Sequence, residues 1–431
     1  MTLLRRLLVV LAISVIVGVA VLVLVRPDYP PRLQYSDSPA YIPAADDSFV
    51  TYLEQNERRI RQALAEYYFL PGQSPFLGRY SLDEVAAMRA PYEIAPATAC
   101  EQQAPGERQG VLLLHGLTDS PYLTRHLAAR LRQDFPCALI RGLLTPGHGT
   151  VPGDLRAVDR QDWRQTVDFG VASFAAEVDA LTVVGYSNGS TLALDYLNRH
   201  PGQTLIKRLV LVVPALGVES GSIWLTPYLR LVRPWLSQLP DTDAVKYESS
   251  SAHGIAEFYR LTNEVRSGTR GELPVPVLML VSGDDTTVDR QLALQYFCDH
   301  ADKTSSHLLW FAGSGDTPLT APCAGIEVID FDIDDPRFIS YSHVALMIPP
   351  DDPHYGRDGN YPVCLGYLAD NDRFSRCLEA APETVYVDAG RVDETGLYDG
   401  RLVRRPTFNP RFDRLHESVR CFIAPDCRLS R

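Results

Sequence analysis

Several features that would define a class of protein at once are missing from this sequence. It has no long run of basic residues and carries a net charge of −12, so we do not expect it to bind nucleic acid. No Cys-x-x-Cys motif or Cys/His cluster has the spacing of a zinc site. The acidic loops at 332–336 and 349–360 lack the ligand spacing of an EF-hand. We therefore expect no metal site, and we interpret these loops as solvated.

Charged residues are also missing between Leu7 and Val25. A helix of that length, at about 1.5 Å per residue, spans roughly 28 Å, close to the thickness of the bilayer hydrocarbon core. No Ala-x-Ala-like cleavage site precedes Arg26. We therefore predict that residues 1–26 are an uncleaved signal anchor, with a cleaved signal peptide as the alternative. The two arginines before the stretch favour a cytoplasmic N-terminus.

The eight cysteines agree with an exported chain, in which disulfides can form and persist. Buried free thiols are the alternative for some of them. Connectivity is not readable from sequence alone, but two short loops suggest pairs, Cys364 with Cys377 and Cys421 with Cys427.

From residue 108 onward, short apolar runs alternate with amphipathic segments. Runs such as GVLLLHG, LTVVGYS and VPVLMLVSG are typical of strands buried on both faces of a parallel sheet. Helical patterns such as LTRHLAARLRQDF and DRQLALQYF lie between them. This alternation predicts an α/β fold with a doubly wound, mostly parallel sheet.

Composition also suggests how the chain is divided. A Pro-rich polar segment and an amphipathic helical pattern assign 27–107 to a stalk and an N-terminal helical extension. Residues 108–431 form the predicted α/β domain. Within it, 217–271 is too long for a simple connection and is rich in Trp, Leu and Tyr. We interpret this interval as a helical lid, with an ordinary packed insertion as the alternative.

One short motif, GYSNG at 185–189, follows an apolar run and precedes a helical pattern. A serine on a strained turn between strand and helix stands above the sheet edge, and flanking glycines let the two elements pack closely. This context predicts that Ser187 is a nucleophile. A plain Gly/Ser turn is the alternative.

Acyl transfer through such a serine also needs two hydrogen-bond donors for the oxyanion. One donor should be the backbone N–H after the nucleophile, at Asn188. The other should come from the loop after an earlier strand. The segment LLLHGLTDSPY offers the N–H of Leu117 there, and we expect His115 in the same segment to be structural.

The acid and the base should follow the nucleophile in the chain. VLMLVSGDDTTVD ends an apolar run with two aspartates, of which Asp285 is the preferred acid and Asp284 the alternative. Among the later histidines, His343 in SYSHVALMIPP lies in a loop after a polar insertion and is the preferred base. The alternative is His354 in DDPHYG.

Taken in chain order, HGLTDSPY, PGHGT, GYSNG, SGDDTTV and YSHV resemble the motifs of the α/β-hydrolase superfamily. The first two look like its carboxylesterase and monoacylglycerol-lipase branch, often labelled serine aminopeptidase-like. The resemblance covers roughly 108–425. It implies an esterase-type Ser-His-Asp mechanism that needs no cofactor. The segment before His343 is longer than the usual connection in the family, and 27–107 lies outside the resemblance.

Together these observations predict a membrane-anchored serine hydrolase that cleaves carboxylic esters of small or lipid-like acyl groups. It would be a single-pass membrane protein with its catalytic domain outside the cytoplasm, on the periplasmic side of the inner membrane in a bacterium. Alternatives on the same triad are an acyltransferase and an aminopeptidase. A catalytically silent hydrolase-fold binding protein is the alternative from another class. The sequence does not indicate an oligomeric state.

Overall fold

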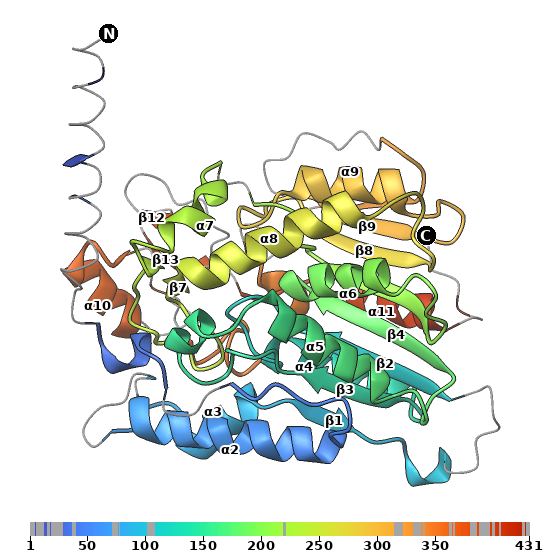
Figure 1. Cartoon of the computed structure of the whole chain (residues 1–431), viewed down its shortest axis with the longest axis horizontal. Helices are drawn as coiled ribbons and strands as arrows, with labels where there is room; N and C mark the ends of the chain where they lie inside the picture. Colours follow the sequence, from blue (N-terminus) through green and yellow to red (C-terminus); the bar gives the residue numbers. More distant parts are fainter. Residues whose placement is uncertain are drawn as a thin grey trace.

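An eight-stranded sheet forms the centre of the molecule (Figure 1). Its strand order is β1-β3-β2-β4-β5-β8-β9-β10, and neighbouring strands are parallel except β1, which is antiparallel to β3. The predicted mostly parallel sheet is thus confirmed. The strands are Tyr92–Ile94 (β1), Gln109–Leu114 (β2), Leu139–Leu143 (β3), Ala180–Tyr186 (β4), Ile206–Val212 (β5), Val277–Ser282 (β8), His307–Phe311 (β9) and Ile326–Ile329 (β10). The computed structural model describes residues 5, 13, 14, 18, 29–36, 40–70, 76, 78–100, 108–218, 221–313, 322–330, 338, 341–361, 364, 367–379, 386, 387, 397, 398, 401–404, 407–424 and 427.

Alternate residues of each central strand enter two separate cores. In β2, Val111 and Leu113 pack into the core beneath α4 and α11, whereas Leu112 and Leu114 pack into the core beneath α5, α6, α8 and α9. Burial on both faces explains why the strands read as continuous apolar runs. The helices of the two layers are Tyr122–Asp134 (α4), Arg160–Ala172 (α5), Asn188–Arg199 (α6), Ala252–Gly268 (α8), Arg290–His300 (α9) and Phe412–Ile423 (α11).

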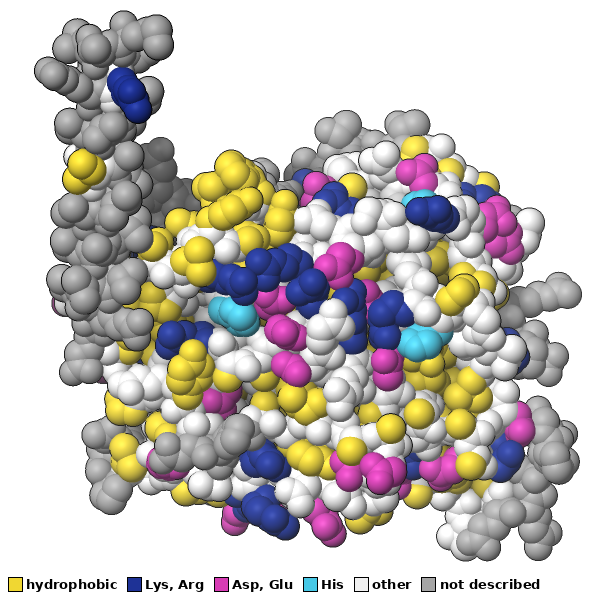
Figure 2. Space-filling model, in the orientation of Figure 1, with side chains coloured by type: hydrophobic (Ala, Val, Ile, Leu, Met, Phe, Trp, Pro, Cys, Tyr) yellow, Lys and Arg dark blue, Asp and Glu magenta, His cyan; other side chains and the backbone are white. Residues whose placement is uncertain are grey.

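The predicted lid interval, residues 217–271, is termed the insertion. It contains one long helix, α8, and several short elements. Ion pairs tie α8 to the core: Arg160 binds Glu257 (2.8 Å), and Arg164 binds both Asp195 of α6 (2.5 Å) and Glu264 of α8 (2.6 Å). Figure 2 shows a band of basic and acidic side chains over these helices. The short elements are Ile223–Leu225 (η4), Thr226–Leu229 (α7), Trp235–Ser237 (β6) and Ser250–Ser251 (β7). The lid assignment and the domain boundaries stay predictions.

The N-terminal extension packs on the β1–β3 edge of the sheet (Figure 1). The Tyr52 hydroxyl donates to the carbonyl of Leu144 (2.7 Å) and accepts from its N–H (2.8 Å). Arg32 pairs with Asp241 of the insertion (2.8 Å), so the extension contacts that part of the chain as well. The elements of the extension are Pro31–Leu33 (η1), Phe49–Tyr67 (α2), Leu82–Arg89 (α3) and Thr98–Cys100 (η2), in addition to β1.

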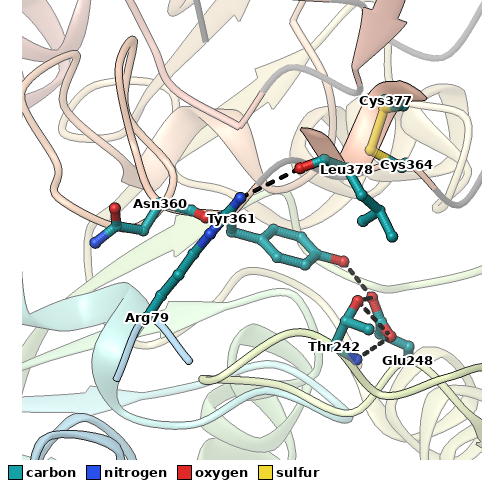
Figure 3. Close-up of a disulfide and its surroundings, with 8 residues drawn as sticks. All are labelled: Arg79, Thr242, Glu248, Asn360, Tyr361, Cys364, Cys377 and Leu378. Carbon is teal, nitrogen blue, oxygen red and sulfur yellow. Dashed lines mark hydrogen bonds between the residues drawn. A yellow bond between two sulfur atoms is a disulfide. The ribbon is translucent and has the colours of Figure 1, made fainter. Parts of the chain in front are cut away.

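The chain after β9, termed the C-terminal segment, is bound to the insertion by buried polar groups (Figure 3). The Tyr361 hydroxyl donates to Glu248, whose carboxylate also accepts the Thr242 N–H (2.7 Å). Burial, together with the charge of Asp243, raises the pKa of Glu248 to about 7. Arg79 of the extension donates to the Leu378 carbonyl (3.4 Å) in the same region.

The two acidic loops were interpreted as solvated, and for one of them this is wrong. Asp352 is buried and accepts hydrogen bonds from the Tyr122 hydroxyl (2.8 Å) and the His354 N–H (2.9 Å). The loop at 332–336 lies outside the described residues. The remaining elements of the C-terminal part are Ala345–Met347 (η5), Asn371–Glu379 (α10), Tyr386–Val387 (β11), Leu397–Tyr398 (β12) and Arg401–Arg404 (β13).

The structure corrects the prediction of an N-terminal transmembrane helix and a single-pass membrane location. In the part of the chain that is described, no helix combines the length and the apolar character that crossing a bilayer requires. The longest helix there, α2, has 19 residues but includes several charged side chains. Of the uncharged stretch behind the prediction, only Ile13, Ser14 and Gly18 belong to the described residues.

All eight cysteines form disulfides in the structure. Two of the four pairs are the predicted ones, Cys364 with Cys377 and Cys421 with Cys427. The two longer closures, which the sequence did not indicate, are Cys100–Cys137 and Cys298–Cys323.

The Cys298–Cys323 disulfide closes a loop of 25 residues between α9 and β10. In the chain-entropy model, a loop of this length contributes about 3 kcal/mol by restricting the unfolded state. We expect the double variant Cys298→Ser/Cys323→Ser to lose about that much free energy of unfolding in urea. The matched variant Cys421→Ser/Cys427→Ser opens a loop of only 6 residues and should lose less. An unchanged urea midpoint in the first variant would contradict the pairing.

Candidate active site

Ser187 stands between β4 and α6 in a strained backbone conformation. Its φ is +54° and its ψ is −116°, outside the regions that a non-glycine residue ordinarily adopts. Its N–H donates to the Val212 carbonyl of β5 (2.9 Å), and its carbonyl accepts the Ser190 N–H (3.0 Å). Although Ser187 is the N-cap residue of α6, its hydroxyl does not cap the helix. The side chain is therefore available for another partner.

The two glycines of the motif allow α6 to lie directly against the sheet. A Cβ on Gly189 would lie 2.2 Å from the Leu114 carbonyl oxygen, and one on Gly185 would lie 2.5 Å from the Ser190 backbone. Both distances are far below van der Waals contact with groups that cannot rotate away. The glycines are required here by the close approach of two backbones.

The structure brings Ser187, His343 and Asp285 into one chain of hydrogen bonds. The Ser187 Oγ lies 2.9 Å from the His343 Nε2, and the His343 Nδ1 lies 2.6 Å from the Asp285 Oδ2. All three residues are buried. Asp285 follows β8 and His343 lies in the loop before η5, so three separate segments meet at the ends of the strands.

The carboxylate of Asp285 is held in its charged form despite complete burial. Burial alone raises its pKa, but the interaction with His343 and the N–H groups of Val288 (3.0 Å) and Thr287 (2.8 Å) lower the pKa below its ordinary value overall. The ring of Tyr186 packs against the His343 ring, with centroids 5.4 Å apart. These contacts fix the orientation of the imidazole.

The two alternative residues have other partners. Asp284 accepts the N–H of Tyr341 (2.8 Å) and so supports the backbone before His343. The His354 Nε2 lies 2.9 Å from Asp243, and its Nδ1 lies 2.7 Å from the Tyr80 hydroxyl. The structure therefore places His354 in the buried polar contacts between the insertion and the C-terminal segment.

The loop after β2 lies against Ser187. A Cβ on Gly116 would be 3.1 Å from the Ser187 Cβ and 3.0 Å from the Tyr186 ring. Leu117 follows directly in this loop. Asn188 is the first residue of α6, so its N–H has no acceptor within the helix. Both N–H groups are thus on segments adjoining Ser187, and their function as oxyanion donors stays a prediction.

An apolar cluster adjoins this loop. It joins the core to the insertion and contains Leu117, Ala215, Val218, Ile223, Phe258 and Val288. A cavity of about 140 Å³ extends from it and is lined in part by Val218, Ile223 and Phe258. The cluster begins beside the Ser187 carbonyl, which accepts the Ala215 N–H (3.3 Å). It therefore gives an apolar side to the site.

Sequence reasoning missed the residues that support the loop after β2. His148, from the quoted segment PGHGT, accepts the N–H of Thr118 at its Nε2 (3.1 Å). Tyr247 of the insertion donates its N–H to the Thr118 carbonyl (2.8 Å). A second histidine in a motif beside glycines could have drawn attention to His148, but no local signal connects Tyr247 to this loop.

Among known proteins, this chain is similar to a thermostable monoacylglycerol lipase from Bacillus sp. (strain H-257). The two are 28% identical over 183 residues, which is 42% of this chain and 71% of that protein. No family model matches the sequence. The similar solved structures include one from work on the metagenome-derived lipolytic enzymes LipS and LipT, with 20% identity, 51% of this chain and 86% of that chain covered, and a TM-score of 0.44. The monoacylglycerol lipase of Paleococcus ferrophilus has 18% identity and a TM-score of 0.42, with 52% of this chain and 88% of that chain covered.

The parallel sheet, the serine turn between β4 and α6 and the sequence match define a class. The chain has an α/β-hydrolase fold. In sequence it is similar to a monoacylglycerol lipase.

The close packing of α6 on β2 can be tested with alanine. Gly189→Ala forces a methyl group against the Leu114 carbonyl, so we expect a loss of at least about 2 kcal/mol in the free energy of unfolding. Gly202→Ala is the matched control, because its Cβ would meet nothing within 4 Å. Thermal unfolding measures both. Equal melting temperatures for the two variants would contradict the packing described here.

Proposed function

We propose that the protein is a serine hydrolase that cleaves carboxylic esters through Ser187, His343 and Asp285. The observation that carries the proposal is the continuous hydrogen-bonded chain from the Ser187 Oγ to the Asp285 carboxylate. A nucleophile, a base in contact with it and a third group that orients the base form the arrangement that activates a serine. The strained turn adds support, since it presents the hydroxyl at the end of the strands.

In the proposed first step, the Ser187 Oγ attacks the ester carbonyl carbon while the His343 Nε2 accepts the hydroxyl proton. The N–H groups of Leu117 and Asn188 stabilise the oxyanion. The tetrahedral intermediate then collapses: the bond to the leaving alkoxide breaks, and His343 returns the proton to that oxygen. The products of this half-reaction are the alcohol and an acyl ester of Ser187.

In the second half-reaction, water attacks the acyl carbon and gives a proton to the His343 Nε2. Collapse of the second intermediate breaks the bond to the Ser187 Oγ, which takes the proton back, and the carboxylic acid leaves. Asp285 keeps the imidazole in the tautomer with its proton on Nδ1 and stabilises the charged form. Every atom comes from the ester, the water and these side chains, so the proposed reaction needs no cofactor.

We further propose that the substrate is lipid-like. The apolar cluster between core and insertion gives an acyl chain a place to leave water, with Phe258 and Ile223 on the insertion side. The similarity to a protein described as a monoacylglycerol lipase supports the same substrate class.

The triad assignment predicts a matched pattern of variants. Ser187→Ala and His343→Ala should each lower kcat for an ester at least a thousandfold, because the triad acts as a unit. Asp285→Asn should lower kcat by about four orders of magnitude, since an amide favours the wrong histidine tautomer. Steady-state kinetics on a chromogenic ester measures all three.

The controls for the triad use the neighbouring residues of the same type. Asp284→Asn keeps an oxygen that can accept the Tyr341 N–H, and His354→Gln keeps polar contact with Asp243. Both should retain kcat within about tenfold when corrected for the folded fraction. An active His343→Ala beside an inactive His354→Gln would refute the assignment of the base.

The substrate proposal predicts a dependence on acyl chain length. Each methylene that becomes buried contributes about 0.8 kcal/mol, or about fourfold in kcat/KM. We therefore expect kcat/KM to rise from acetyl toward octanoyl esters. Phe258→Ala should flatten this rise because it removes an apolar wall. Trp224→Ala is the control, because that side chain is 54% exposed and should leave the rise intact. A steady fall in kcat/KM from acetyl upward would exclude a lipid-like substrate.

A further inference from the structure

The turn that follows β2 carries a second strained residue. Thr118, next to Leu117, has a φ of +68°. A β-branched residue rarely adopts this conformation, so surrounding contacts must hold it in place. The strain lies one residue from the N–H that the proposed mechanism uses at the oxyanion.

Two hydrogen bonds orient the peptide group that carries the Leu117 N–H. The carbonyl of this peptide, on Gly116, contacts the His115 Nδ1 (2.7 Å) and accepts the Asp119 N–H (3.3 Å). Because the His115 Nε2 accepts the N–H of Thr145 (3.0 Å), the ring proton lies on Nδ1 and is donated to Gly116. In a trans peptide the N–H points opposite to the carbonyl. Fixing the carbonyl therefore fixes the direction of the Leu117 N–H.

The two peptide groups that flank Thr118 are also held. The Thr118 N–H donates to the His148 Nε2 (3.1 Å), and the Thr118 carbonyl accepts the Tyr247 N–H (2.8 Å). The His148 ring must carry its proton on Nδ1, which faces the carbonyls of Thr145 (3.1 Å) and Pro146 (3.2 Å). Burial lowers the pKa of His148 to about 4, so the ring is neutral at neutral pH and remains an acceptor.

The insertion contributes two neighbouring residues to this support. The Tyr247 ring stacks on the His148 ring, with centroids 6.3 Å apart and planes 8° from parallel. Lys246 lies 3.5 Å from the buried carboxylate of Asp119, the residue after Thr118. The insertion therefore contacts the turn through backbone, ring and charge together.

We propose that His148, together with Lys246 and Tyr247 of the insertion, positions the Leu117 N–H for oxyanion binding. The inference rests on the proposed function, because it assigns these residues to the oxyanion site of that reaction. On this account the insertion is a structural part of the catalytic site. His148, Lys246 and Tyr247 are positioning residues and do not touch the substrate.

A misplaced oxyanion donor weakens binding of the transition state but not of the ground-state ester. Loss of the support should therefore lower kcat and leave KM nearly unchanged. It should also weaken the binding of a trifluoromethyl ketone, which forms a tetrahedral adduct with the nucleophile. The inhibition constant should rise by the same factor by which kcat/KM falls. Loss of a residue that only stabilises the fold would change neither kcat nor the inhibition constant of the ketone once the folded fraction is corrected.

The decisive variants are at His148. His148→Leu removes the acceptor of the Thr118 N–H and should lower kcat about 10- to 100-fold, with KM within about twofold and the inhibition constant of the ketone raised in parallel. His148→Gln retains an oxygen that can accept this N–H and should recover much of the loss. Tyr52→Phe is the matched control: it breaks buried hydrogen bonds to Leu144, at the start of the loop after β3 that carries His148, without contacting Thr118. It should reduce stability and leave kcat unchanged.

A second pair of variants tests the insertion. Tyr247→Pro removes the N–H that binds the Thr118 carbonyl and should lower kcat at least tenfold, whereas Tyr247→Phe keeps that N–H and the stacked ring and should lower it less than threefold. Lys246→Met should lower kcat severalfold. If Tyr247→Pro does not fold, the His148 variants decide the question alone.

The outcomes separate this inference from the proposed function. Wild-type protein that hydrolyses no ester, or an active Ser187→Ala, rejects the proposed function. Active wild type with inactive Ser187→Ala, but with His148→Leu at full kcat or changed only in KM, overturns the positioning inference and leaves the triad intact. Equal losses in His148→Leu and His148→Gln without a matching change in ketone binding also overturn it.

Discussion

The backbone of Ser187 is the constraint on which the rest of the site depends. A φ of +54° at a non-glycine residue persists only where neighbouring contacts outweigh its cost. Here those contacts are backbone hydrogen bonds to β5 and α6, and a helix that lies directly on the sheet through two glycines. With α6 fixed in this way, the hydroxyl points away from its own helix toward the histidine. Movement of α6 would separate the Ser187 hydroxyl from His343.

The parts of the chain around this turn are joined by buried polar contacts. Glu257 of α8 is buried and binds Arg160 of α5. The insertion also contacts the C-terminal segment, where the Asp243 carboxylate lies 2.9 Å from the buried His354 Nε2. A buried group of this kind is costly if its partner is lost. These contacts therefore favour one arrangement of the insertion over others, which is what a positioning function for Tyr247 requires.

Much of the fold was predictable from local pattern. The central strands are apolar on both faces and were visible as continuous runs, and the helices between them show a 3.6-residue period. The strands β1 and β10 were missed because elements of three and four residues show no period. Burial of Asp352 was missed because its partners, including Tyr122, are distant in sequence. The transmembrane prediction rested on hydropathy alone.

The candidate site was predictable in part. The motif GYSNG and the order of acid and base in the chain indicated Ser187, Asp285 and His343, because the roles follow from strand ends in a known direction. The choice between His343 and His354 could not be settled from sequence, since both lie in loops after the last central strand. In the structure His343 contacts Ser187 and Asp285, whereas His354 contacts Asp243. The contact between Thr118 and Tyr247 likewise joins segments that are distant in sequence.

Covalent labelling tests the central claim most directly. A fluorophosphonate reacts with a serine only when that serine is activated as a nucleophile. Wild-type protein should gain one adduct mass, and peptide mapping should locate it on the peptide that contains Ser187. His343→Ala, folded to the same extent, should label far more slowly. An adduct on another residue, or equally fast labelling without His343, would contradict the account.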